Sequence, residues 1–128
     1  NLMKSVGRPW RQLSFDLFKK IANDATKFPG KVEVLRLYKD GEPLLNKNLP
    51  QMIKYAKDVG ASKRIDTTTN AALLDERRGK ELAEAGLDRI NISVYGVSNE
   101  HYRNFSSAKI EFERILANVR NFYEVRKQ

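Results

Sequence analysis

The sequence of 128 residues contains no cysteine. The chain therefore cannot form a disulfide bond, and it cannot hold a zinc ion or an iron–sulfur cluster through thiolates of its own. Histidine is nearly as scarce, because His101 is the only one, and we expect it in a polar surface loop. A metal site built on His101 would lack partners of the right kind. We therefore expect no metal ligand among these residues.

Long apolar runs are also missing. No stretch approaches the roughly 18 consecutive apolar residues that a membrane-spanning helix needs. The first ten residues carry charge without the apolar segment of a secretion signal. We therefore expect a chain that stays off the membrane and resides in the cytoplasm. The apolar residues that are present recur with helical and strand periods, which argues against an intrinsically disordered chain.

The chain is basic, with 24 lysines and arginines against 16 aspartates and glutamates and a net charge of +8. Such a balance suggests nucleic-acid binding. The basic residues are spread along the whole length, however, and no arginine- or lysine-rich run with interleaved aromatic residues occurs. We therefore expect solvated helix faces rather than a nucleic-acid interface.

Four segments show apolar residues at the spacing of an amphipathic helix, at residues 14–28, 48–59, 75–85 and 107–126. Ser14 and Asn48 are predicted N-caps, and Gly60 fits the left-handed position that follows a helix. Residues 1–12 are predicted to be irregular. The predicted buried stripes are Leu17, Ile21, Ala25 and Phe28 in the first helix, Met52, Ile53, Ala56 and Val59 in the second, and Phe112, Ile115, Leu116, Val119, Phe122 and Tyr123 in the last.

Three short segments rich in β-formers alternate with these helices, at residues 32–38, 64–68 and 89–94. A helix between consecutive strands requires a crossover, so we expect parallel strands with right-handed connections. In the third strand, apolar residues alternate with polar ones, Ile90, Ile92 and Val94 against Asn91, Ser93 and Tyr95; in the second, Asp66, Thr68 and Asn70 share one side. One apolar and one polar face fit an open barrel better than a doubly wound sheet. We therefore predict an α/β fold in which residues 1–128 form one segment of a partial (β/α) TIM barrel, with three parallel strands and four helices.

Polar clusters follow each predicted strand, at residues 40–43, 67–70 and 93–96. Ligands of parallel α/β folds bind at the carboxyl ends of the strands, so the clusters should converge on one surface. Gly41 permits close approach of a ligand to the backbone, Pro43 stiffens the loop, and Glu42 is suited to an ammonium group. Thr69 and Asn70 offer neutral donors and acceptors for a carboxylate or a ribose. Taken singly, each cluster also fits a plain turn.

Together, these residues resemble the radical S-adenosylmethionine (SAM) superfamily, in the branch with a GGEP-type motif. The motif is matched by residues 40–43, with Asp40 at the place of the first glycine. The family's TNG segment is matched by residues 69–71, where Ala71 replaces glycine, and its AGLD turn and following IxIS strand are matched by residues 85–88 and 90–93. The resemblance extends from about residue 13 to residue 123.

The resemblance implies that the three strands are the second to fourth of a partial barrel. It also implies that Gly41, Glu42 and Pro43 bind the amino group of SAM. Thr69 and Asn70 would lie near the methionine end of SAM, with Thr68 as the alternative threonine. Ser93 would contact the carboxylate or the ribose. The seven candidate SAM-binding residues are thus Gly41, Glu42, Pro43, Thr68, Thr69, Asn70 and Ser93.

The family holds a [4Fe–4S] cluster through a CxxxCxxC loop, which this chain does not contain. We therefore expect no catalytic residue here and no reductive cleavage of SAM by this chain alone. We expect a piece of a longer enzyme rather than a degenerate homologue. A barrel segment on its own exposes unpaired strand edges, which a stand-alone protein would not readily tolerate. Those edges also predict self-association of the isolated chain.

The resemblance also gives a hint about the substrate of the parent enzyme. The residues around Tyr95 and Tyr102 are similar to enzymes that carry a SPASM-type domain and modify peptides or small polar metabolites. The alternative is a non-catalytic basic α/β module that binds a small anionic ligand, a protein partner or nucleic acid. SAM binding by the chain would distinguish the two.

Overall fold

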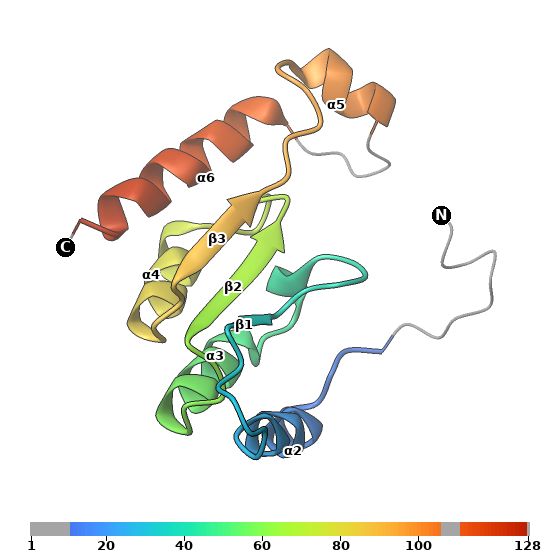
Figure 1. Ribbon diagram of the computed structural model, residues 1–128. Helices are drawn as coiled ribbons and strands as arrows, with labels where there is room; N and C mark the ends of the chain where they lie inside the picture. The colour runs from blue at the N-terminus through green and yellow to red at the C-terminus, as the bar shows by residue number, and fades with distance from the viewer. Residues whose placement is uncertain (1–10, 106–110, 128) are drawn as a thin grey trace.

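The computed structural model describes residues 11–105 and 111–127 (Figure 1). Most of the predicted irregular N-terminal segment and the predicted start of the last helix at residue 107 lie outside the described residues. The elements are, in chain order, α2 (Phe15–Ala25), β1 (Val34–Arg36), the 3-10 helix η1 (Pro43–Leu45), α3 (Leu49–Asp58), β2 (Arg64–Thr69), α4 (Glu76–Glu84), β3 (Arg89–Ile92), α5 (Asn99–Phe105) and α6 (Phe112–Val125). None of the helices in these ranges is long and apolar enough to cross a membrane.

The three strands form one parallel sheet in the order β1-β2-β3, seen side by side in Figure 1. Leu35 is paired with Ile65, and Thr67 is paired with Ile90. Helix α3 connects the first two strands and α4 connects the second pair, as parallel pairing requires. The predicted α/β fold, with the parallel sheet of a partial (β/α) barrel, is confirmed.

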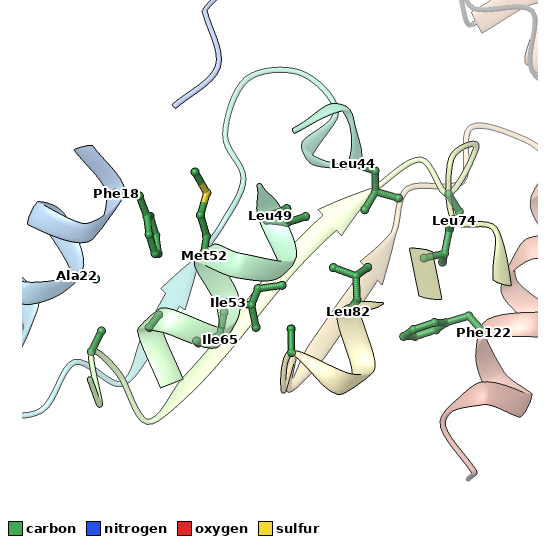
Figure 2. Close-up of a cluster of buried hydrophobic side chains, with 14 of the residues drawn as sticks. Phe18, Ala22, Leu44, Leu49, Met52, Ile53, Ile65, Leu74, Leu82 and Phe122 are labelled. Carbon is green, nitrogen blue, oxygen red and sulfur yellow. The ribbon is translucent and has the colours of Figure 1, made fainter. Parts of the chain in front are cut away.

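The two faces of the sheet differ as predicted. Ile65, Thr67 and Thr69 are buried on the face that the helices cover. On the opposite face Thr68 and Asn70 are half-buried, and Asp66 is buried. The core fills the space between the sheet and the helices, where Ile53 of α3 and Leu82 of α4 are fully buried (Figure 2). The face away from the helices is open, which is the arrangement of a barrel interior.

The predicted buried stripe of the first helix is wrong by one position. Ser14 does cap the helix, since its Oγ accepts a hydrogen bond from Leu17 N at 3.3 Å. The buried residues are Phe18 and Ala22, and the predicted Ala25 is partly buried against the core. The predicted Leu17, Ile21 and Phe28 are 50%, 44% and 63% exposed. Phe28 also lies beyond the helix, which ends at Ala25. Two neighbouring stripes of this sequence have helical spacing, and packing against α3 selects the one that carries Phe18.

The middle helices lie close to their predicted positions. Met52, Ile53 and Ala56 are buried as predicted, and Val59 is partly buried. Gly60 has a φ of +66°, the left-handed conformation expected after a helix. Asn48 occupies the N-cap position of α3 but makes no capping hydrogen bond with its side chain, so that part of the prediction is wrong.

One helix was not predicted, so the described residues contain five α-helices where the sequence predicts four. A separate short helix, α5, contains His101, which is exposed on a helix rather than in a loop. Helix α6 begins at Phe112 and buries Ile115 and Phe122. Three residues predicted to be buried are exposed instead: Val94 beyond the end of β3, and Leu116 and Tyr123 on α6. The sequence of α5 is too polar and too short for a periodic stripe, which is why the periodicity did not reveal it.

Asp88, which precedes β3, contacts both the start of β2 and helix α3. Its Oδ2 accepts a hydrogen bond from Ile65 N at 2.7 Å, and its carboxylate contacts Lys57 Nζ at 2.6 Å. Burial opposes ionisation, but the bonds from Lys57 and Ile65 and the charges of Lys57 and Arg64 outweigh it and hold the pKa of the Asp88 carboxyl below its ordinary value. The ionised carboxylate therefore stabilises the fold.

This pKa shift predicts acid sensitivity. A carboxyl whose pKa is lowered by folding stabilises the protein above its unfolded pKa of about 3.9, and the contribution is lost as the pH falls through the lowered value. We expect Asp88→Asn to cost about 1 kcal/mol at pH 7 and little at pH 2, since the amide oxygen can still accept from Ile65 N. Urea denaturation at both pH values measures this, and an equal loss at both would contradict it. The exposed control Asp58→Asn should change stability at pH 7 by less than about 0.5 kcal/mol.

Candidate functional site

The loop after β1 is shaped by three consecutive residues. Gly41 has a φ of +87°, which a glycine adopts without the strain of a side chain. Glu42 is the N-cap of η1 and Pro43 is its first residue. Leu44 follows and is 1% exposed, so it anchors the loop in the core. The loop is therefore held in a fixed position at the carboxyl end of β1.

The Glu42 carboxylate bonds this loop to the end of β2. Its Oε1 accepts hydrogen bonds from Leu44 N at 3.0 Å and from Thr69 Oγ1 at 2.6 Å. Its Oε2 accepts from Asn70 N at 2.9 Å. A carboxylate has about four acceptor positions. Donors from the described residues occupy three of them, so among these residues one position is open. We call Glu42, Thr69 and Asn70 the carboxylate clamp.

The turn after β2 is held by its own polar groups. Thr69 Oγ1 accepts a hydrogen bond from Ala71 N at 3.0 Å, and Asn70 Oδ1 accepts from Ala72 N at 2.9 Å. Ala71 has a φ of +60° at the position where the family has glycine. The substitution therefore leaves the left-handed turn in place. Asn118 Nδ2 of α6 donates a hydrogen bond to Ala71 O at 2.8 Å, so α6 also stabilises the turn.

The third cluster joins at the end of β3. Ser93 N donates to Thr69 O at 2.9 Å. On the open face, Asn91 Nδ2 lies 3.4 Å from Thr68 Oγ1. The predicted convergence of the polar strand ends is thus confirmed: Glu42 in the loop after β1, Thr69 at the end of β2 and Ser93 directly after β3 meet at one edge of the sheet.

A cavity of about 670 Å³ adjoins this edge beside β1. Gly41, Glu42 and Pro43 form one of its walls, and Arg36 of β1 lines it as well. Its apolar lining includes Phe18, Leu35, Leu37, Leu45 and Met52. The volume lies within the usual range for small-molecule sites, and an apolar wall with a few placed polar groups is their usual chemistry.

The chain is a parallel α/β segment with one open polar face, and its binding loops gather at the carboxyl ends of its strands. These features are those of part of a ligand-binding (β/α) barrel. The family model of the radical SAM superfamily matches residues 3–127. The chain belongs to the radical SAM superfamily.

Curated relatives with established names are found in archaea and bacteria. An Fe-coproporphyrin III synthase of Methanosarcina barkeri is 30% identical over 88% of this chain and 27% of its own length. A GTP 3',8-cyclase of Staphylococcus carnosus is 32% identical over 84% of the chain and 30% of its own length. A PqqA peptide cyclase of Bradyrhizobium diazoefficiens is 33% identical over 83% of the chain and 28% of its own length. The chain thus spans less than a third of these relatives.

Membership in this superfamily implies SAM and a [4Fe–4S] cluster in the parent enzyme. The cluster does not fit the residues present, because the chain has no cysteine. The described ranges also contain no group of three or more His, Cys, Asp or Glu side chains that could hold a metal ion. SAM, by contrast, would meet polar groups at the edge where the three strands end.

The structure refines the placement of the predicted site residues. The hydroxyl of Thr69, which is 2% exposed, is bonded within the carboxylate clamp, whereas Thr68 carries its hydroxyl on the open face. Sequence reasoning missed Asn118, which supports the turn from α6, and Arg36, which lines the cavity. Arg36 could have been found as a charged residue of the predicted strand at 32–38, but nothing in the sequence pattern places Asn118 near residue 71.

Proposed function

We propose that this chain forms part of the SAM-binding wall of a radical SAM, [4Fe–4S]-dependent enzyme. The observation that carries the proposal is the carboxylate clamp, which joins the Gly41–Pro43 loop to the end of β2 through Glu42. The clamp fixes two binding loops relative to each other before a ligand arrives. Such preorganisation lowers the entropy cost of binding.

Each candidate residue has a role in this proposal. Gly41 and Pro43 present the loop backbone to the SAM amino group, and the open acceptor position of Glu42 takes the positive charge. Thr69 acts as a positioning residue for Glu42. Hydroxyl and amide groups of Thr68, Asn70 and Ser93 serve the carboxylate or the ribose.

The chain's own contribution is binding and orientation. The reductive cleavage of SAM that the family carries out requires a thiolate-bound cluster, for which these residues supply no ligand. We therefore assign no catalytic residue to this chain, and we expect the cluster ligands in a part of the parent enzyme outside these 128 residues. The open reading frame of the source gene on both sides of this segment would test that expectation.

SAM binding by the chain is the direct test. Titration calorimetry with SAM should show weak, saturable binding to the wild-type chain. Glu42→Ala should abolish it, and Glu42→Gln should weaken it at least about tenfold, because the ammonium group loses a charged acceptor. Glu84→Gln, which removes one exposed carboxylate on α4, is the control and should bind as the wild type does. Unchanged affinity in both Glu42 variants would refute the assigned role.

The same experiment separates the alternative function. The net charge of +8 supports a basic binding module for a small anion, a partner protein or nucleic acid. Such a module would show no SAM binding but salt-sensitive binding to random-sequence nucleic acid or to another polyanion. SAM binding that persists in moderate salt would favour the radical SAM proposal.

The substrate class of the parent remains a proposal. The names of the relatives mention GTP, a coproporphyrin and a peptide. We infer a peptide or a small polar metabolite for this enzyme, with a SPASM-type domain elsewhere in the parent. The cytoplasmic location inferred from the sequence also stays a prediction.

Self-association of the isolated chain is a further prediction. Strands β1 and β3 are the two edges of the sheet in the described residues, and each lacks a partner on its outer side. Unpaired strand edges are templates for pairing with another chain. Multi-angle light scattering should therefore show dimers or larger species that increase with concentration. A strictly monomeric chain across a hundredfold concentration range would contradict this.

A further inference from the structure

A row of charged side chains crosses the open face of the sheet below the proposed SAM edge. The strand register pairs Arg36 of β1 with Asp66 of β2, and Asp66 with Arg89 of β3. Register partners in a parallel sheet project to the same face. This row lies on the face opposite Ile65, which is buried under the helices. With Arg64, which contacts Asp66, these residues form what we call the arginine row.

The charges of the arginine row are unbalanced. Asp66 Oδ1 lies 3.7 Å from Arg36 Nε, and Asp66 Oδ2 lies 3.8 Å from Arg64 Nη2. Both contacts are too long for hydrogen bonds, and Oδ1 is buried without a hydrogen-bond partner. The row therefore contains three arginines and one carboxylate. Two of the guanidinium groups lie within 4 Å of Asp66, Arg89 is its register partner on β3, and Arg64 also acts on the Asp88 carboxylate.

Exposure shows which groups are available to a ligand. The side chain of Asp66 is only 3% exposed, whereas those of Arg36 and Arg64 are 61% and 44% exposed. Arg89 is also exposed, and in the part of the chain that the structure describes its side chain makes no ion pair. Asp66 is therefore buried, whereas the arginine side chains are accessible to a ligand. Guanidinium groups bind carboxylates and phosphates through paired hydrogen bonds.

The arginine row is connected to the proposed SAM site. The cavity beside β1 is lined both by the Gly41–Pro43 loop and by Arg36. Asp66 and Thr69 are three residues apart on β2, which corresponds to about 10 Å at the usual strand rise. One extended small molecule can therefore reach the strand edge and the arginine row together. Closing a barrel over this face would also remove water from the surplus charges, which raises the need for an anionic partner.

We propose that the arginine row binds an anionic group, a carboxylate or a phosphate, of the substrate. This inference rests on the proposed function, because it names the substrate class for the same side of the sheet. Arg36 and Arg89 are the binding residues. Asp66 is a positioning residue that reduces the repulsion between the guanidinium groups. The substrate is then an acidic peptide, a polycarboxylate or a phosphorylated metabolite.

Inorganic pyrophosphate and citrate are the probes for a test on this chain at low ionic strength. We expect saturable binding of at least one of them by titration calorimetry, with NMR shifts of the amides near residues 36, 66 and 89. The probe that binds more tightly identifies the anion as phosphate or carboxylate. Arg36→Gln and Arg89→Gln should each weaken binding about tenfold, and Arg36→Lys should lie in between.

The control is Arg77→Gln, which removes one positive charge from an exposed ion pair with Glu81 on α4. It should weaken binding less than twofold. An equal loss in Arg77→Gln and Arg36→Gln, or no saturable binding of either probe, would overturn the proposal. SAM titrations of the same variants keep the two proposals apart. Pyrophosphate binding without SAM binding would support anion binding by the arginine row and refute the proposed SAM-binding function. SAM binding without anion binding would support the SAM-binding function and refute anion binding by the arginine row.

Discussion

Replacement of Glu42 by alanine is expected to reduce the free energy of unfolding by about 3 kcal/mol. The change removes the acceptor for three donors, the amides of Leu44 and Asn70 and the hydroxyl of Thr69. Each bond to a charged group contributes about 1.5–3 kcal/mol. The effects are not additive, and water can reach part of this half-buried loop, so the total lies below their sum. Urea denaturation followed by circular dichroism measures the loss.

Glu42→Gln is the matched control for this variant. Its side-chain oxygen can still accept from Leu44 N and Thr69 Oγ1, but its amide nitrogen cannot accept from Asn70 N. We therefore expect a loss of about 1 kcal/mol, which leaves the chain folded for the SAM titration. Equal stabilities of Glu42→Ala and wild type would mean that the carboxylate clamp does not form in solution.

The fold could be predicted from the sequence because its signals are local. The alternation of β-rich segments with helices requires parallel crossovers, and the structure has them. Asp75 and Gly86 mark the limits of α4 by capping chemistry alone. The face of α2 could not be predicted, since two stripes have the same period and only contact with α3 distinguishes them.

The site could be predicted only to the level of strand ends. Parallel topology brings residues 40–43, 67–70 and 93–96 to one edge, so their convergence follows from the sequence. The bond between Glu42 and Thr69 joins residues 27 positions apart and depends on the bend of one loop. The same is true of the arginine row, because pairing Arg36 with Asp66 requires the exact strand register. A shift of one residue would place them on opposite faces.

Ala71→Val is expected to be the other strongly destabilising change near the site, with a loss of about 3 kcal/mol. Ala71 has a φ of +60° and is fully buried. A left-handed conformation costs an L-residue about 1–2 kcal/mol, and a β-branched side chain is a rarer outlier there. The two extra methyl groups must also enter a packed core, which costs about 1–3 kcal/mol. Thr69, which bonds the Ala71 amide, would then be displaced from the carboxylate clamp.

Two variants separate conformational strain from crowding in this turn. Ala71→Gly restores the residue that the family has here, relieves the strain but loses a buried methyl group, so its stability should lie within about 1 kcal/mol of the wild type. Ala72→Val adds the same two methyl groups at the adjacent, half-buried position, whose φ is not in the left-handed region. It should cost less than about 1 kcal/mol. If Ala72→Val destabilised the chain as much as Ala71→Val, crowding of the turn alone would explain the loss, and the left-handed conformation of residue 71 would not be what selects a small side chain there.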